Sequence, residues 1–256
     1  MYEVINGQKI WTSSAHYADM MFLFCRTEFD KSKHDGLSYL LVPMSAPGIE
    51  VRPLVTMTGR AEFNETFFTD VRVPADQIVM GRGEGWHVAN VTLKYERMLL
   101  GDANKLTHRL VRVVDLMKKT TLDGRRFIDI PEYRERLLKL QGEVMASKYH
   151  GLRLMTEQAK GEDSGVKRLI VKLNGTMIAY RLSSLAVDVL GAAGLAYEPV
   201  GESFEDDEAT TWQIDNMYDI GLIIGGGSSN IQKNIIGERG LGLPREPKSA
   251  ATTVRG

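Results

Sequence analysis

Short apolar runs and period-two alternation characterise the first third of the chain. The runs at 20–25 and 37–42 have the length and composition of buried strands. Over residues 66–73 apolar and polar residues alternate, which predicts a half-buried strand with Phe67, Val71 and Val73 on its inner face. This part of the chain therefore predicts β-structure.

The turn signals in this region favour a compact antiparallel arrangement. The dipeptide Asn6-Gly7 stands between two strand-like runs, and Asn-Gly predicts a tight hairpin because both residues tolerate positive φ. Several short strands within residues 1–81 suggest a small antiparallel barrel or a sandwich.

The spacing of apolar residues changes to three and four after a short glycine-rich linker. From Trp86 to Met117 it predicts one long helix, which Asp123-Gly124 ends. A second helix is expected to begin at Pro131, a residue that favours the first helical position. Further helices are predicted over 166–187, 211–223 and 228–239.

Long amphipathic helices joined by short breaks are typical of an antiparallel bundle. The predicted fold class is therefore α+β: a small antiparallel β-barrel domain over 1–81, followed by an all-α four-helix bundle over 85–245 and a tail over 246–256.

Composition narrows the classes of function. A net charge of -1 argues against a nucleic-acid partner. The single cysteine, Cys25, excludes an intrachain disulfide and fits a reducing cytoplasm. The five histidines lack metal-ligand spacing, and no apolar run has the length of a membrane span. We expect a cytoplasmic protein without a metal site, nucleic-acid partner or membrane span.

Three segments, in the order of a known family, resemble acyl-CoA dehydrogenases. They are residues 9–19 (KIWTSSAHYAD), 63–74 (FNETFFTDVRVP) and 228–245 (SSNIQKNIIGERGLGLPR). The resemblance implies the family's middle β-domain and carboxyl-terminal helical domain, and hence an FAD enzyme that desaturates acyl-CoA thioesters. The family's amino-terminal helical domain has no counterpart in this chain. We therefore expect either part of a longer protein or a short subunit completed by another polypeptide.

The family's reaction removes a proton from Cα of the thioester and passes a hydride from Cβ to flavin N5, so it needs a base. In many members the base is a glutamate ahead of the last helix, where this chain has Gly226, which cannot accept a proton. A second group of members carries it in a Leu-x-x-Glu-Arg pattern on the first long helix. Here residues 93–97 (LKYER) supply Glu96.

Helical spacing places Glu96 on the same stripe as Leu93 and Leu100, so we expect it to be buried. A buried carboxylate takes up a proton more readily, which suits a base. The alternative is an ion pair with a neighbouring helix. Arg97 is expected in the substrate site, with a surface charge as its alternative.

The resemblance also implies cofactor and substrate contacts. The residues expected at the flavin are Trp11, Thr12, Ser13, Gly191, Ser228, Ser229 and Asn230. Trp11 would lie along the flavin ring, unless it is a core aromatic. The run that begins at Gly191 corresponds to a stretch facing a partner subunit's flavin diphosphate, although Asp188 and Ala192 depart from the family pattern.

The alternative role of Ser228, Ser229 and Asn230 is to cap the last helix, and both roles can hold at once. Gly226 is expected to donate its N–H to the thioester oxygen and to leave open space beside the substrate; a flexible helix-entry loop is the alternative.

The partners that the resemblance implies are an acyl-CoA substrate, an electron-transfer flavoprotein as electron acceptor, and further subunits in a homo- or hetero-oligomer, a dimer or tetramer. The alternative function is a non-catalytic or truncated subunit of a heteromeric acyl-CoA dehydrogenase that supports assembly.

Overall fold

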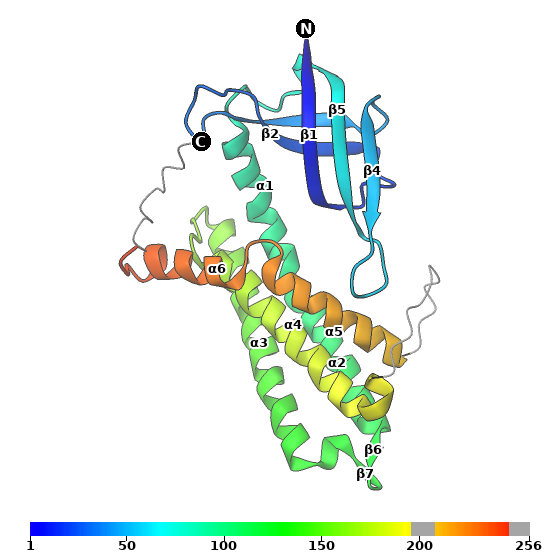
Figure 1. The fold of residues 1–256 in the computed structure, drawn as a ribbon. Coiled ribbons are helices and arrows are strands. Elements are labelled where there is room, and N and C mark those ends of the chain that lie inside the picture. Colours follow the sequence, from blue (N-terminus) through cyan, green and yellow to red (C-terminus); the bar gives the residue numbers. More distant parts are fainter. Residues whose placement is uncertain (196–207, 246–256) are drawn as a thin grey trace. The chain divides into compact units, whose positions relative to one another are not determined.

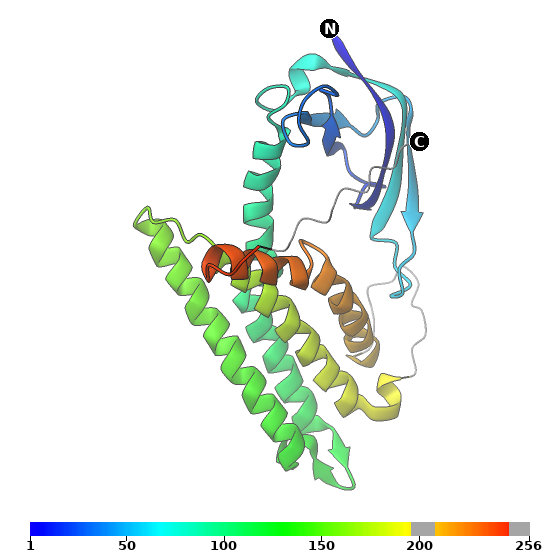
Figure 2. The same ribbon diagram turned by 60° about the vertical axis from the view of Figure 1, so that its left-hand side comes forward.

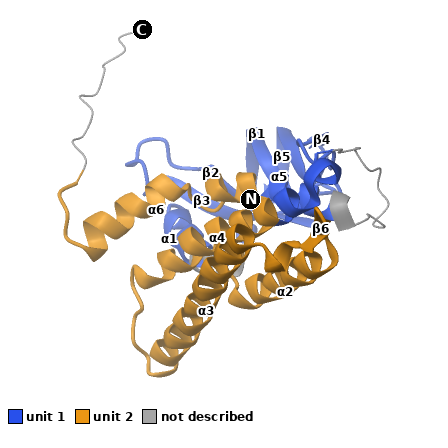
Figure 3. Ribbon diagram, turned by 90° about the horizontal axis from the view of Figure 1, so that it is seen from below, with its two compact units in different colours: residues 1–96, 186–218 blue, residues 97–185, 219–256 orange. Residues whose placement is uncertain are grey.

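The computed structural model describes residues 1–195 and 208–245 of the chain. The chain divides into two compact units, coloured separately in Figure 3. One unit comprises residues 1–96 and 186–218, and the other comprises residues 97–185 and 219–256.

Two antiparallel sheets occupy the start of the first unit (Figure 1). One has the order β1-β5-β4, with β1 at Tyr2–Ser13, β5 at Phe63–Pro74 and β4 at Ile49–Leu54. The other pairs β2 (Met20–Arg26) with β3 (Leu37–Pro43). Both sheets contribute to one apolar core, formed by Ile5, Met21, Leu23, Leu40, Val42, Phe68, Val71 and Val73. The antiparallel β-prediction is confirmed, but among the described strands the sheets do not close into the expected barrel.

The predicted hairpin at Asn6-Gly7 is wrong, because β1 continues through it. Asn6 instead clasps a bulge in β5: its Nδ2 donates to Asp70 Oδ1 at 3.0 Å, and its Oδ1 accepts from the Asp70 backbone N–H at 2.9 Å. Asp70 has φ +51°, in the left-handed region, and the register slips between Ile5 and Gly7.

This bulge also changes which side chains of β5 face the core. Val71 and Val73 are buried as predicted, but N-terminal to the bulge the inner residue is Phe68, which is 4% exposed, rather than Phe67. A one-residue slip exchanges the two faces of a strand, so the alternation could not be extrapolated across Asp70.

The helical part comprises six helices in the described residues (Figure 1). They are α1 (Gly85–Leu100), α2 (Ala103–Lys119), α3 (Pro131–Ala159), α4 (Lys167–Leu190), α5 (Glu208–Ile224) and α6 (Ser229–Ile235). A hairpin of β6 (Thr121–Leu122) and β7 (Arg125–Arg126) joins α2 to α3, which begins at Pro131 as predicted. Figure 2 shows α2, α3 and α4 running beside one another, so the predicted bundle is confirmed.

The predicted single helix from Trp86 to Met117 is wrong, because it breaks at Gly101 and restarts with Asp102 as N-cap. Gly101 lies against the backbone of α4: a Cβ built on it would be 2.1 Å from Val171 O, and one built on Gly175 would be 2.4 Å from Gly101 Cα. Two backbones this close exclude any side chain, which explains glycine at both positions.

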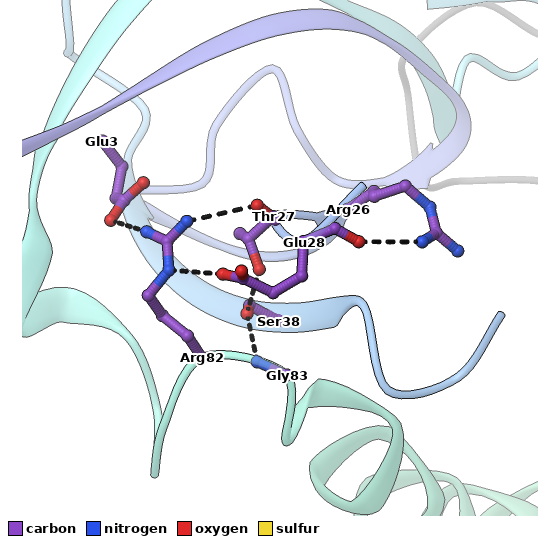
Figure 4. Close-up of polar contacts among 7 residues, drawn as sticks. All are labelled: Glu3, Arg26, Thr27, Glu28, Ser38, Arg82 and Gly83. Carbon is purple, nitrogen blue, oxygen red and sulfur yellow. Dashed lines mark hydrogen bonds and ion pairs between the residues drawn. The ribbon is translucent and has the colours of Figure 1, made fainter. Parts of the chain in front are cut away.

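The linker that precedes α1 is tied to the β-strands (Figure 4). Arg82 pairs with Glu3 and, at 2.6 Å, with Glu28. The Gly83 N–H donates to Ser38 Oγ at 3.0 Å. These contacts fix the start of α1 relative to β3.

One described segment, Lys167–Gly194, is long and apolar enough to cross a membrane by length and composition alone. Of its most apolar window, 39% is buried within the chain. Core helices of soluble proteins meet the same criterion, so this match is weak support for a membrane span.

Candidate functional site

Trp11 lies near the carboxyl end of β1 and is exposed to solvent. The register slips between Lys9 and Thr12, which places one extra residue on β1. Trp11 adopts φ +63°, rare for a bulky side chain. It is 62% exposed, and its ring makes an edge-to-face contact with Phe63 at 5.9 Å between ring centroids. The indole is therefore not a core aromatic in this chain, and its exposed ring can receive a ligand.

Asn64 on β5 fixes the backbone beside Trp11. Its side chain is fully buried, and Nδ2 donates to Thr12 O at 3.0 Å. Thr12 is half-buried, whereas Ser13 is exposed. The sequence interpretation missed Asn64; its signal is a polar residue among inward-facing positions of a strand.

Leu100 occupies the position where a side chain on Gly226, in the loop between α5 and α6, would begin. Gly226 has φ +65° and Gly227 has φ +95°. A Cβ at Gly226 would lie 2.4 Å from Leu100 Cδ1. The expectation that Gly226 opens space is wrong for this chain, because Leu100 fills that space and positive φ strains other residues.

Two buried polar side chains converge on this loop. Lys172 of α4 is fully buried, and its Nζ donates to Gly227 O at 2.8 Å and to Ile223 O at 3.2 Å. Gln232, also fully buried, has Nε2 3.5 Å from Gly226 O. Neither was predicted. The signal for Lys172 is its spacing, since it lies three residues after buried Leu169 on the inner face of its helix.

The two serines at the start of α6 form hydrogen bonds with the backbone of this chain. Ser228 Oγ accepts a hydrogen bond from the Ile231 N–H at 3.4 Å, so its capping role is confirmed. Ser229 Oγ donates to Ile223 O at 3.3 Å. Asn230 is exposed, and of the three it has the most accessible side chain.

Glu96 is exposed on α1, so its expected burial is wrong. Thr92, one turn earlier, is exposed as well, and Leu93 and Leu100 are only half-buried. Periodicity identifies the apolar face of a helix, but burial needs another element to cover that face. No ion pair to Glu96 occurs among the described residues, and nothing can be said of the Arg97 side chain, which lies outside them.

Gly191 begins an exposed turn that ends α4. It has φ +57°, and a Cβ there would meet no atom within 4 Å. Gln213 of α5 holds this turn by donating from Nε2 to Ala193 O at 2.9 Å. The turn is therefore an accessible surface on a fixed support.

The residues that the resemblance assigns to the flavin differ in accessibility. Trp11, Ser13, Gly191 and Asn230 are exposed, as contact with a cofactor requires. The hydroxyls of Ser228 and Ser229 are engaged by the chain's own backbone.

Family comparison identifies the class. The model of the acyl-CoA dehydrogenase middle domain matches residues 3–71, and that of the acyl-CoA dehydrogenase C-terminal domain matches residues 83–241. The chain belongs to the acyl-CoA dehydrogenase family, as its motifs predicted, and this is a family of FAD-dependent flavoproteins.

Individual relatives sharpen this assignment. The chain is 41% identical to acyl-CoA dehydrogenase IpdE1 of Mycolicibacterium smegmatis over 249 residues, which are 96% of this chain and 59% of the relative. It is 40% identical to IpdE1 of Mycobacterium tuberculosis, covering 96% and 60% respectively. The chain thus spans about 60% of the length of these curated relatives.

Two solved structures share the fold. The ChsE4-ChsE5 complex from Mycobacterium tuberculosis has a TM-score of 0.81 at 30% identity, covering 96% of this chain and 62% of that one. The Tcur3481-Tcur3483 steroid acyl-CoA dehydrogenase has a TM-score of 0.83 at 27% identity with the same coverage. Each of these structures is named for two different polypeptides.

Proposed function

We propose that this chain forms the middle and carboxyl-terminal domains of an enzyme that desaturates acyl-CoA thioesters between Cα and Cβ, with Glu96 as the base. The observation that carries the proposal is the closed Gly226 position. Leu100 occupies the room where the base of many relatives would stand. Glu96 lies one turn before Leu100 on the same face of α1, and its carboxylate is exposed.

Each group has a distinct role in this proposal. Glu96 takes the proton from Cα. The Gly226 N–H donates to the thioester oxygen and stabilises the enolate-like charge that then develops. Trp11 and Ser13 hold the flavin ring, while Arg97 contacts the substrate. FAD, when bound, supplies the acceptor for the hydride from Cβ.

The remaining flavin contacts are assigned to exposed surfaces. Thr12 lies beside the ring contacts, Ser228, Ser229 and Asn230 lie toward the flavin nucleotide, and Gly191 lies toward the diphosphate of a partner subunit's flavin. The proposed assembly is a homo- or hetero-oligomer in the cytoplasm, with an electron-transfer flavoprotein as acceptor.

Activity is proposed for the assembled protein, because the chain spans about 60% of its curated relatives. The domain boundaries that we propose are 1–81 for the middle domain and 85–245 for the helical domain; the expected tail over 246–256 lies outside the described residues. Bulky acyl-CoA thioesters, including the polycyclic class named for the steroid dehydrogenase neighbour, are the first substrates to test.

The decisive experiment compares Glu96→Gln with Glu132→Gln, a matched change at another exposed helical carboxylate. The chain is co-produced with the products of neighbouring genes, and bleaching of the flavin spectrum is followed anaerobically after acyl-CoA is added. We expect Glu96→Gln to slow bleaching about 10²–10⁴-fold, the usual contribution of a general base, and Glu132→Gln to leave it unchanged. Bleaching of Glu96→Gln at the wild-type rate would refute the base assignment.

A second candidate is a non-catalytic subunit that supports assembly. It is favoured by the glycine at position 226 and by the paired polypeptides in both structural neighbours. In that case Glu96→Gln has no effect, while omission of this chain abolishes the partner's flavin binding or activity. The same preparations therefore separate the two functions.

A further inference from the structure

We propose that Lys172 is a positioning residue that fixes the loop of residues 225–227 and thereby aims the Gly226 amide. The proposal rests on the function proposed above for the Gly226 N–H. It concerns a side chain that the resemblance to the family did not assign.

The burial of Lys172 demands an explanation. A fully buried ammonium is costly unless hydrogen bonds replace its hydration. Its Nζ donates to Ile223 O at 3.2 Å and to Gly227 O at 2.8 Å. Ile223 stands in the last turn of α5, where carbonyls lack partners in their own helix and carry the negative end of its dipole. The ammonium therefore sits where a cation is stabilised.

The two accepting carbonyls lie on either side of Gly225 and Gly226 along the chain. Gly226 and Gly227 both have positive φ, and glycine loses more conformational freedom on ordering than any other residue. One cation bound to the Ile223 and Gly227 carbonyls restricts the peptide planes between these two residues. The direction in which the Gly226 N–H points is therefore restricted as well.

The support for Lys172 is itself rigid. Three residues further along α4, Gly175 packs backbone-to-backbone against Gly101. Leu100, the residue before that junction, closes the Gly226 position. The helix that carries the ammonium and the side chain that bounds the loop are therefore fixed at one crossing.

The charge of Lys172 also suits this place. Its Cε would lie 3.8 Å from a Cβ built on Gly226. The charge of Lys172 therefore lies beside the Gly226 backbone, in a buried place where Coulomb interactions are weakly screened. Lys172 acts through the loop and does not itself contact the reacting atoms.

Hydrogen–deuterium exchange tests the positioning role without any cofactor. The comparison is wild type, Lys172→Met and Lys233→Met, the last a matched change at an exposed lysine of α6. In Lys172→Met we expect about tenfold or faster exchange in peptides covering residues 225–229, from the loss of hydrogen bonds to a charged donor. Peptides of α2 and α3 should exchange as in the wild type, and Lys233→Met should change neither region.

Two outcomes overturn the proposal. One is unchanged exchange at 225–229 in Lys172→Met, and the other is equal acceleration throughout the helices, which would make Lys172 a general stabilising residue. If Lys172→Met does not fold, Lys172→Gln, which retains amide donors without the charge, is judged by the same criteria. Loss of protection throughout both variants also overturns it.

The assembled enzyme adds a functional readout. Lys172→Met should lower the rate of flavin reduction more than the affinity for acyl-CoA, since it disturbs a contact that strengthens in the transition state. A wild-type assembly that never bleaches would refute the proposed function and leave the exchange result standing. Failure of one proposal is thus distinguishable from failure of the other.

Discussion

Replacement of Gly175 by alanine should destabilise the chain, although alanine is the better helix former. A Cβ at Gly175 would lie 2.4 Å from Gly101 Cα and 3.1 Å from its carbonyl atoms. The obstructing atoms are backbone, which cannot rotate away as a side chain can. Either α4 or the junction between α1 and α2 must therefore shift. Gly142 of α3 is a matched control, because a Cβ there meets no atom within 4 Å.

The two substitutions should change the free energy of unfolding in opposite directions. In a helix interior alanine is favoured over glycine by about 0.5–1 kcal/mol, and at Gly142 this preference is the whole effect. At Gly175 overpacking of about 1–3 kcal/mol opposes it, and its central value of about 2 kcal/mol leaves a net loss of about 1–1.5 kcal/mol. Two identical substitutions should then differ by about 2 kcal/mol, or about 4–8 °C in melting temperature for a chain of this size.

Urea unfolding followed by helical circular dichroism measures both variants against the wild type. Gly142→Ala should move the midpoint up and Gly175→Ala should move it down, with an unchanged slope. If Gly175→Ala were as stable as Gly142→Ala, the two helices would not pack at this distance. The account of the break at Gly101, and of the rigid support for Lys172, would then fail.

Two further predictions concern ion pairs whose carboxylate is buried. The hydrogen bond from Lys167, at 2.7 Å, is the main cause that lowers the pKa of Glu157 from 4.5 to about 2. A depressed pKa stabilises the fold above pH 4.5 and loses that contribution as the pH falls toward 2. Glu157→Gln should therefore flatten the loss of stability between these pH values; a titration parallel to the wild type would contradict this. Asp219 is 1% exposed and accepts from Arg109 Nη1 at 2.6 Å and Ser183 Oγ at 2.8 Å, so Asp219→Ala should cost about 3 kcal/mol in urea unfolding, and a cost below about 0.5 kcal/mol would refute its role.

The elements that the sequence predicted correctly are those that local signals specify. Pro131 marks the first position of α3 because its ring fixes φ and it lacks an N–H. The run at 37–42 is mostly apolar, which predicts a buried strand, and it forms the largely buried strand β3. In both cases the deciding information lies within a few residues.

The errors arose where distant residues decide the local backbone. Asn6 reaches Asp70, 64 residues away, and converts an expected hairpin into a bulge. Gly101 breaks a helix whose apolar periodicity continues beyond it, because Gly175 of α4 lies against it. Neither contact can be inferred from the spacing of residues near the break.

In the candidate site too, the sequence predicted the features that depend on neighbouring residues and not those that depend on distant ones. The empty position of the usual base was readable from Gly226, and Glu96 from its short motif. The exposure of Glu96 was not readable, because periodicity does not reveal whether another element covers a helix face. The role of Lys172 was not predicted, because a lysine on an apolar stripe can be interpreted only when the carbonyl groups that it binds are known.

The features around Gly226 depend on one helix crossing, and this bears on how loss of function should be interpreted. Gly101 and Gly175 set the distance between helices, Leu100 then closes the space beside Gly226, and Lys172 reaches the loop carbonyls from the same turn of α4. A substitution that moves the crossing alters the loop even when every proposed catalytic group is intact. A Glu96 variant, in contrast, leaves this packing alone because its side chain is exposed. Loss of activity with unchanged exchange at the loop therefore points to the base, whereas loss of activity with faster exchange points to the support beneath it.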